Sequence, residues 1–194
     1  MKIVLLDINK EMTDAWHKYF DGEDVEIVND SLENYLSTHT VDCIVSPANA
    51  FGLMDGGYDL AISNYYADTH QVDIGRLVRT HIKGTYFGEQ PVSSALVVEV
   101  ANAPWLIHCP TMRTPRRIKD LEVVYHCMRN TLIASRFWVN IDTVIIPAFG
   151  GATGGVPYDD IACLMWKAYH QIMQPPEKID WDYARENKYL LKEN

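Results

Sequence analysis

Long apolar runs, export signals and paired cysteines are all missing from this 194-residue sequence. No stretch approaches the ~20 apolar residues that a membrane-spanning helix needs. The first residues also lack the basic, apolar and small segments of a secretory signal. The cysteines lie far apart in apolar stretches, which predicts free, buried, reduced thiols at Cys43, Cys109, Cys127 and Cys163. We therefore expect a cytoplasmic protein with no membrane partner.

Positive charge is also scarce. Lysine and arginine together number 17, against 26 aspartates and glutamates, so the net charge is −9. Non-specific nucleic-acid binding depends on basic side chains, and this balance therefore argues against a nucleic-acid partner. A small anionic ligand is still compatible with the composition, because backbone amides can hold an anion locally.

Several common site motifs are absent. Gly150 and Gly155 have the spacing of a Walker phosphate loop, but valine and proline follow them in place of lysine and Ser/Thr. No GxGxxG fingerprint follows the first expected strand. Too few residues separate Cys109 from Arg113 for the loop of a thiolate phosphatase. Local spacing indicates neither a Ser/His/Asp triad nor a set of metal ligands, so we expect no metal and no cofactor.

Apolar segments alternate with amphipathic ones along the chain. Asn9 and Ser31 precede two amphipathic stretches and are expected helix caps. Expected strands cover 2–8, 25–28, 41–45, 92–100, 104–109 and 143–146, and expected helices cover 10–20, 31–36, 58–66, 72–82, 118–138 and 156–173. This alternation predicts an α/β domain with a mostly parallel sheet over residues 1–174. Residues 175–194 form a charged tail whose aromatic side chains are expected to pack it on the domain as a short extra helix.

Two glycine-bearing loops, 46–59 and 147–157, each follow an expected strand and precede an expected helix. Glycine lets the backbone turn sharply and approach a ligand closely. A helix start presents unpaired N–H groups and the positive end of a dipole. In parallel sheets, ligands sit beyond the carboxyl ends of the strands, where both loops are expected. The two loops therefore predict a diphosphate site that needs no lysine.

Four parts of the sequence carry a family resemblance: LDIN at 6–9, SPAN at 46–49 with GGYDLAI at 56–62, WLIH at 105–108 and PAFGGATGGVP at 147–157. They resemble the macro domain family, which binds ADP-ribose. Its first loop reads roughly Asn-Ala-Ala-Asn, then several glycines and Val-Asp, and its second reads Pro-Ala-Ile-Ser-Thr-Gly, then Gly-Tyr-Pro. The resemblance covers most of residues 1–173. It implies a three-layer α/β/α fold with a mixed, mostly parallel sheet of six or seven strands.

The resemblance implies a role for each matched position. Asp7 resembles the acid that accepts a hydrogen bond from the adenine amino group, and the Ile8 backbone N–H is implied to contact the ring. Asn49 resembles an asparagine at the distal ribose, and Asp59 a helix-start aspartate that caps in many members and assists chemistry in some. In the alternative interpretation, Asp7 and Asp59 are simple helix caps and Asn49 is a turn residue. Further implied ligand contacts are Ala48, Gly56, Gly57, Tyr58, Phe149, Gly150, Gly151, Ala152, Thr153 and Gly154.

The chain also departs from the family pattern. Ser46 replaces the first asparagine, and Pro47 stiffens the next position. Asp55 stands where a glycine is usual, and its carboxylate would repel a phosphate unless it points away, orients water or meets a ligand hydroxyl. Gly154 falls where many members carry a phenylalanine that shields the distal ribose, and Val156 replaces a tyrosine. Three aromatic residues are candidate substitutes for that wall: Tyr58, Phe149 and Tyr158.

The segment 109–117 holds the basic cluster of this acidic chain, with Arg113, Arg116 and Arg117. Two interpretations are open for it. The arginines either line one side of the cleft and contact phosphate, or belong to a solvated loop and pair with surface carboxylates.

Three functions follow from the resemblance. The first is hydrolysis of ADP-ribose 1''-phosphate, or of ADP-ribose attached to a protein side chain, with Asn49, Asp55 and Asp59 as the catalytic residues that place the water. The second is an ADP-ribose-binding module without chemistry. The third is a macro-like fold whose ligand has changed. The implied partners are ADP-ribose, its 1''-phosphate and ADP-ribosylated protein.

Overall fold

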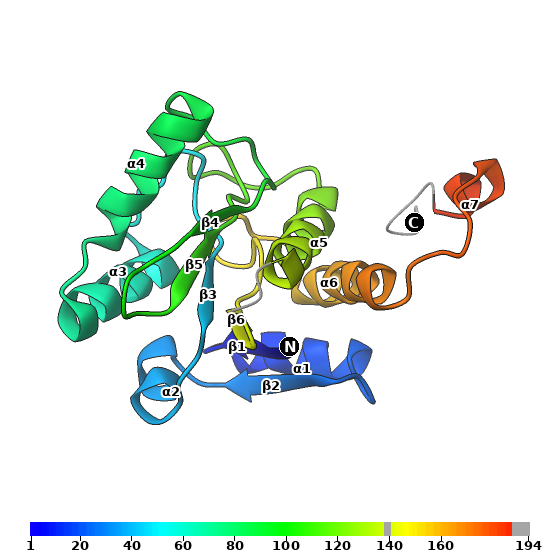
Figure 1. Ribbon diagram of the computed structural model, residues 1–194. Helices are drawn as coiled ribbons and strands as arrows, with labels where there is room; N and C mark the ends of the chain where they lie inside the picture. The colour runs from blue at the N-terminus through cyan, green and yellow to red at the C-terminus, as the bar shows by residue number, and fades with distance from the viewer. Residues whose placement is uncertain (138–140, 188–194) are drawn as a thin grey trace.

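Strands and helices alternate along most of the described residues, 1–137 and 141–187 of this computed structural model (Figure 1). The strands are β1 (Lys2–Asp7), β2 (Val25–Asn29), β3 (Cys43–Ser46), β4 (Leu96–Val98), β5 (Trp105–His108) and β6 (Thr143–Ile146). The helices are α1 (Lys10–Tyr19), α2 (Leu32–Thr38), α3 (Gly57–His70), α4 (Ile74–Tyr86), α5 (Glu122–Phe137), α6 (Tyr158–Met173) and α7 (Trp181–Glu186). The pairs α3–α4, β4–β5 and α6–α7 are consecutive elements of one kind.

The strands form one six-stranded sheet with the order β2-β1-β6-β3-β5-β4. All neighbouring pairs are parallel except β4 and β5, which are antiparallel and joined by a turn in which Asn102 has a φ of 58°. β6 lies between β1 and β3 and pairs with both. This arrangement confirms the prediction of a mixed, mostly parallel sheet.

Helices cover both faces of the sheet, which completes the three predicted layers (Figure 1). Buried side chains of α1, α5 and α6 pack on one face, with Trp16, Met128 and Leu164 among them. Those of α2, α3 and α4 pack on the other, where Tyr66 and Val78 are fully buried. Successive strand residues alternate between the two cores, because side chains of a strand point to opposite faces.

The helix starts agree with the predicted caps, while some element ends differ. The side chains of Asn9 and Ser31 each accept a backbone N–H bond at the start of α1 and α2. α3 and α4 run four residues beyond their predicted ends of 66 and 82. The residues that follow them, Gln71 and Phe87, adopt the left-handed conformation in which glycine is most common. The predicted strand over 92–100 is shorter, because Ser93 lies in a turn with a φ of 66°.

The C-terminal tail contributes α7, which Asp180 caps. Gln171 of α6 donates a hydrogen bond from Nε2 to the Tyr183 hydroxyl, which connects α7 to the domain. Trp181 is 79% exposed and does not serve as an anchor. Tyr189 of the tail and the predicted last residue of α5, Trp138, lie outside the described residues. Within those residues, no helix has the length and apolar character needed to cross a membrane.

Candidate functional site

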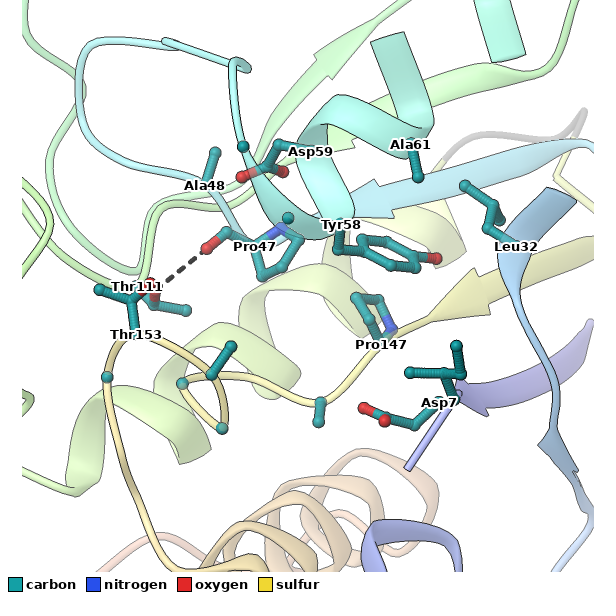
Figure 2. Close-up of a pocket in the computed structure, with 18 of the residues that line it drawn as sticks. Asp7, Leu32, Pro47, Ala48, Tyr58, Asp59, Ala61, Thr111, Pro147 and Thr153 are labelled. Carbon is teal, nitrogen blue, oxygen red and sulfur yellow. Dashed lines mark hydrogen bonds between the residues drawn. The ribbon is translucent and has the colours of Figure 1, made fainter. Parts of the chain in front are cut away.

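The candidate site lies where β1, β6 and β3 end side by side. The first glycine-bearing loop follows β3 and the second follows β6. Because these strands are parallel, both loops emerge at the same edge of the sheet. They border one pocket with a volume of about 680 Å³, within the range of roughly 300–1,000 Å³ that is typical of small-molecule sites. Figure 2 shows Asp7 and Leu32 at one end of the pocket and Thr111 and Thr153 at the other.

Internal hydrogen bonds hold the first loop in shape. Asn49 donates from Nδ2 to the Leu53 carbonyl oxygen at 2.8 Å, and its Oδ1 accepts the Phe51 N–H at 3.1 Å. The next residue, Ala50, donates its N–H to the carbonyl oxygen of Met112, which follows β5. Asn49 lines the pocket, yet both ends of its amide are engaged within the loop. It is therefore a turn-forming residue, whatever contact it also makes with a ligand.

A buried polar pair supports this loop from beneath. Gln90 donates from Nε2 to the carbonyl oxygens of Ser94 and His108, which leaves its Oε1 to accept from His108 Nδ1 at 2.7 Å. The Gln90 N–H also donates to the Ala50 carbonyl oxygen. Burial lowers the pKa of His108 to about 4, so the imidazole is neutral at physiological pH.

The second loop folds tightly on itself and on Ile118. Gly150 has a φ of 84°, and its carbonyl oxygen accepts the Val156 N–H. A Cβ on Gly154 would lie 2.5 Å from the Gly150 carbonyl oxygen and 2.6 Å from Ile118 Cδ1. The phenylalanine that many macro domains carry at this position therefore does not fit the loop as it is folded here.

Carboxylates dominate the charge around the pocket. Within the described residues, its lining includes Asp7, Asp30, Asp55 and Asp59 but no lysine or arginine. The positive potential for an anion comes from the start of α3, where Gly56 is the N-cap and no side chain caps the helix. Gly56 and Gly57 both line the pocket, so the first N–H groups of the helix, which have no intrahelical acceptor, lie at its border.

Asp7 occupies the end of β1 and accepts the Asn9 N–H at 2.8 Å. Asn9, rather than Asp7, caps α1 with its side chain, and Asn9 Nδ2 donates to the Tyr158 hydroxyl at 2.6 Å. Burial raises the pKa of Asp7, and the hydrogen bond from Asn9 partly opposes that change. Asp7 is therefore not the side-chain cap of α1, although its carboxylate holds the N–H of the N-cap residue, and the same carboxylate borders the pocket.

Asp59 lies in the first turn of α3 and accepts a hydrogen bond from Ser46 Oγ at 2.7 Å. Burial raises the pKa of Asp59 to about 6, Asp55 adds to that effect, and the Ser46 hydrogen bond opposes it. The serine that replaces the first asparagine of the family pattern is therefore the direct partner of this carboxyl. Part of the charge on Asp59 is lost near neutral pH, a property found at many functional sites.

Most predicted contacts line the pocket, and Phe149 is the exception. Ala48, Asn49, Asp55, Tyr58, Asp59 and the residues 150–154 all border it, as do Asp7 and Ile8. The Ile8 side chain is 77% exposed, which suits a role for its backbone alone. Phe149 is fully buried in the core beside α5 and α6 and is not among the lining residues. Ala148 faces the pocket, whereas Phe149 points into the core. The aromatic residues of the lining are therefore Tyr58 and Tyr158.

The arginines of the 109–117 loop do not line the pocket, and two of them contact other parts of the protein. Arg113 makes two hydrogen bonds to the Glu89 carboxylate and lies over the Phe51 ring. Arg117 packs so closely on Gly155 that a Cβ there would lie 1.4 Å from Arg117 Nη1. The interpretation in which these arginines pair at the surface therefore fits Arg113, and none of the three lines the pocket.

Sequence reasoning missed several lining residues. Asp30, Ser31 and Leu32 follow β2, while Thr111 and Met112 follow β5. The signal was present, because each segment continues from the carboxyl end of a strand in the same sheet. Thr111 also ties the two sides together, since its Oγ1 donates to the Pro47 carbonyl oxygen (Figure 2).

Comparison with known proteins gives a consistent result. A model of the macro domain family matches residues 45–165, which run from the end of β3 into α6. An uncharacterized protein of Aquifex aeolicus is 29% identical over 145 residues, spanning 73% of this chain and 78% of that protein.

Solved macrodomain structures share the fold. The macrodomain of Mycobacterium tuberculosis DarG is 21% identical with a TM-score of 0.56, over 70% of this chain and 85% of that one. A glycine-to-valine variant of the Oceanobacillus iheyensis macrodomain with ADP-ribose is 18% identical with a TM-score of 0.57, over 73% of this chain and 76% of that one. Variants of the same macrodomain with an asparagine or an aspartate replaced by alanine also match, and these two positions are ten residues apart.

Proposed function

Because this chain belongs to the macro domain family, we propose that it binds ADP-ribose in the pocket between its two glycine-bearing loops. The observation that supports the proposal most strongly is the placement of both loops at the ends of adjacent strands, with Asp7 at one end of the same pocket. In this arrangement Asp7 accepts a hydrogen bond from the adenine amino group. The start of α3 and the second loop surround the diphosphate, and the distal ribose lies toward Asn49 and Thr153.

The charge pattern favours recognition of a diphosphate by the backbone. Four aspartates line the pocket and would repel a ligand held only by its negative charge. Backbone N–H groups at a helix start bind phosphate through directed hydrogen bonds. Such bonds require a phosphate in a fixed position, which a flexible chain of phosphates does not provide. This pocket therefore suits a compact nucleotide better than a nucleic-acid strand.

Titration calorimetry with Asp7→Ala tests the adenine contact. Loss of the acceptor for a buried amine is expected to weaken ADP-ribose binding by about 1–3 kcal/mol, or roughly 5- to 150-fold. Asp14→Ala is the matched control, because it removes the same charge from an exposed position on α1 outside the pocket. Unchanged affinity in the Asp7 variant would place the base elsewhere. If the wild-type protein neither binds ADP-ribose nor is stabilised by it, the pocket has a different ligand.

We also propose, as a second activity of this site, hydrolysis at the distal ribose. The observation that favours it is the exposed Asp55 carboxylate, which borders the pocket on the same loop as Asn49. Asn49 and Asp59 are ten residues apart, the spacing of the asparagine and aspartate substituted in the Oceanobacillus iheyensis macrodomain. In the phosphatase reaction, water attacks the phosphorus of ADP-ribose 1''-phosphate, and the bond to the ribose oxygen breaks to give ADP-ribose and phosphate. In the alternative reaction, water attacks the ribose carbon bound to a protein side chain, the bond to that side chain breaks, and ADP-ribose and the unmodified side chain are released.

Two assays separate binding from hydrolysis. Release of inorganic phosphate from ADP-ribose 1''-phosphate and release of ADP-ribose from a modified protein are each measured with wild type and Asp55→Asn. The variant is expected to lose turnover of the substrate that wild type cleaves, while calorimetry shows retained ADP-ribose binding. Tight binding by wild type without either product would leave a binding module and remove the hydrolase proposal.

A further inference from the structure

One buried polar atom in the pocket has no partner in the protein. The Tyr58 hydroxyl is shielded from solvent and makes no hydrogen bond within the described residues, although its residue lines the pocket. Buried hydroxyl groups in proteins are nearly always hydrogen-bonded, because an unpaired one loses its contacts with water and gains nothing in return. An exception inside a ligand pocket points to a partner supplied by the ligand.

Two other buried or pocket tyrosines show how unusual this is. Tyr66, two turns further along α3, donates from its hydroxyl to the Pro104 carbonyl oxygen at 2.7 Å. Tyr158, across the pocket, accepts from Asn9 Nδ2 at 2.6 Å. Tyr58 also departs from the family pattern described above, which has valine before the helix-start aspartate. An apolar residue at this position would avoid the cost of an unpaired hydroxyl.

The position of Tyr58 fits the base end of the ligand. Figure 2 shows its ring above Pro147, with the hydroxyl end toward Leu32, on the side of the pocket where Asp7 lies. Burial raises the pKa of Tyr58, and the charges of Asp59 and Asp7 raise it further. The phenol therefore keeps its proton and is available as a donor.

We propose that the Tyr58 hydroxyl donates a hydrogen bond to a ring nitrogen of the bound adenine, which makes Tyr58 a specificity-determining residue beside Asp7. The inference rests on the proposed binding of ADP-ribose. Adenine presents an amino group that donates and ring nitrogens that accept, and Asp7 with Tyr58 would satisfy one of each.

Tyr58→Phe tests the proposal through two measurements that change in opposite directions. The affinity for ADP-ribose is expected to fall about tenfold, because the ligand nitrogen loses its donor. The melting temperature of the free protein is expected to stay level or rise by about 2–4 °C, because an unpaired hydroxyl is removed from a buried place. Tyr66→Phe is the control: it removes a satisfied hydroxyl away from the pocket, so the melting temperature falls and the affinity stays the same.

Deaza analogues of ADP-ribose, with one ring nitrogen at a time replaced by CH, identify the partner atom. One analogue is expected to bind wild type about tenfold more weakly than ADP-ribose does. The same analogue and ADP-ribose are expected to bind Tyr58→Phe with equal affinity, because the hydrogen bond is already lost. Wild-type affinity in Tyr58→Phe overturns the inference and leaves the proposed function standing. The inference is also overturned if Tyr58→Phe lowers the affinity for every deaza analogue tenfold, as it does for ADP-ribose, since no ring nitrogen is then the partner. Failure of wild type to bind ADP-ribose removes the proposed function itself.

Discussion

Replacement of Asp59 by asparagine is expected to make the free protein more stable, by an amount that depends on pH. The carboxyl of Asp59 is buried at the start of α3, with the Ser46 hydroxyl as its hydrogen-bond donor. Asparagine has nearly the same shape, keeps an oxygen for Ser46 and carries no charge. The substitution therefore removes the cost of ionising this group inside the fold with little change in packing.

The pKa of Asp59 sets the size and sign of the effect. Burial raises it from the ordinary value of 3.8 to about 6, which corresponds to about 3 kcal/mol. A carboxyl with a raised pKa binds its proton more tightly in the folded state than in the unfolded state. Stability therefore falls as pH rises from about 4 through 6, and the loss is nearly complete at about pH 7. The variant escapes this loss, so its advantage is expected to be about 3 kcal/mol at pH 7.5 and close to zero at pH 4.

Thermal unfolding of wild type and Asp59→Asn from pH 4 to 8 measures this difference. For a domain of this size, about 3 kcal/mol corresponds to a shift of roughly 6–12 °C. His108 titrates in the opposite direction, because burial lowers its pKa from 6.5 to about 4 and stability is lost as pH falls through that range. Its contribution is the same in both proteins and cancels in the difference.

Asp14→Asn serves as the control for charge alone, since Asp14 is exposed on α1 and does not contribute to the raised pKa of Asp59. A stability difference between wild type and Asp59→Asn that stays constant from pH 4 to 8 would refute the reasoning. So would a variant that is less stable than wild type at pH 7.5. Either result would mean that Asp59 is fully ionised in the folded protein at no cost. A confirmed cost would show that the chain retains a destabilising carboxyl next to its candidate site.

Three further substitutions test the loops. Gly154→Ala is expected to lower the free energy of unfolding by about 1–3 kcal/mol in a urea titration, because the added methyl meets a backbone oxygen at 2.5 Å; unchanged stability would mean that the second loop opens easily. Gly56→Ala is expected to change it by about 1 kcal/mol or less, since a Cβ there meets nothing within 4 Å, and a larger loss would indicate a different loop conformation. Arg113→Ala is expected to leave ADP-ribose affinity unchanged in calorimetry, because Arg113 pairs with Glu89 at the surface, whereas weaker binding would give this arginine a role at the phosphate.

The sequence was sufficient for the layers of the fold and for both loops, and insufficient where packing decides the outcome. Periodicity and the caps at Asn9 and Ser31 predicted the first helices, because those signals act within a few residues. The side toward which Phe149 points depends on the path of its loop over the core, which no local pattern records. The pairing of Ser46 with Asp59 joins a strand end to a helix start 13 residues later. From the sequence alone, Ser46 is a departure from the family pattern and Asp59 a match to it, and nothing indicates that the two side chains meet.

The insertion of β6 between β1 and β3 has a consequence for how the protein is made. Without β6, the pairings leave two separate half-sheets, β2-β1 and β3-β5-β4. β6 is the last strand in the described chain, so the two halves join only after residue 146 has been synthesised. Contacts between residues so far apart in sequence form slowly. Until then the first half-sheets expose unpaired strand edges, which makes this interval of translation the one most prone to aggregation.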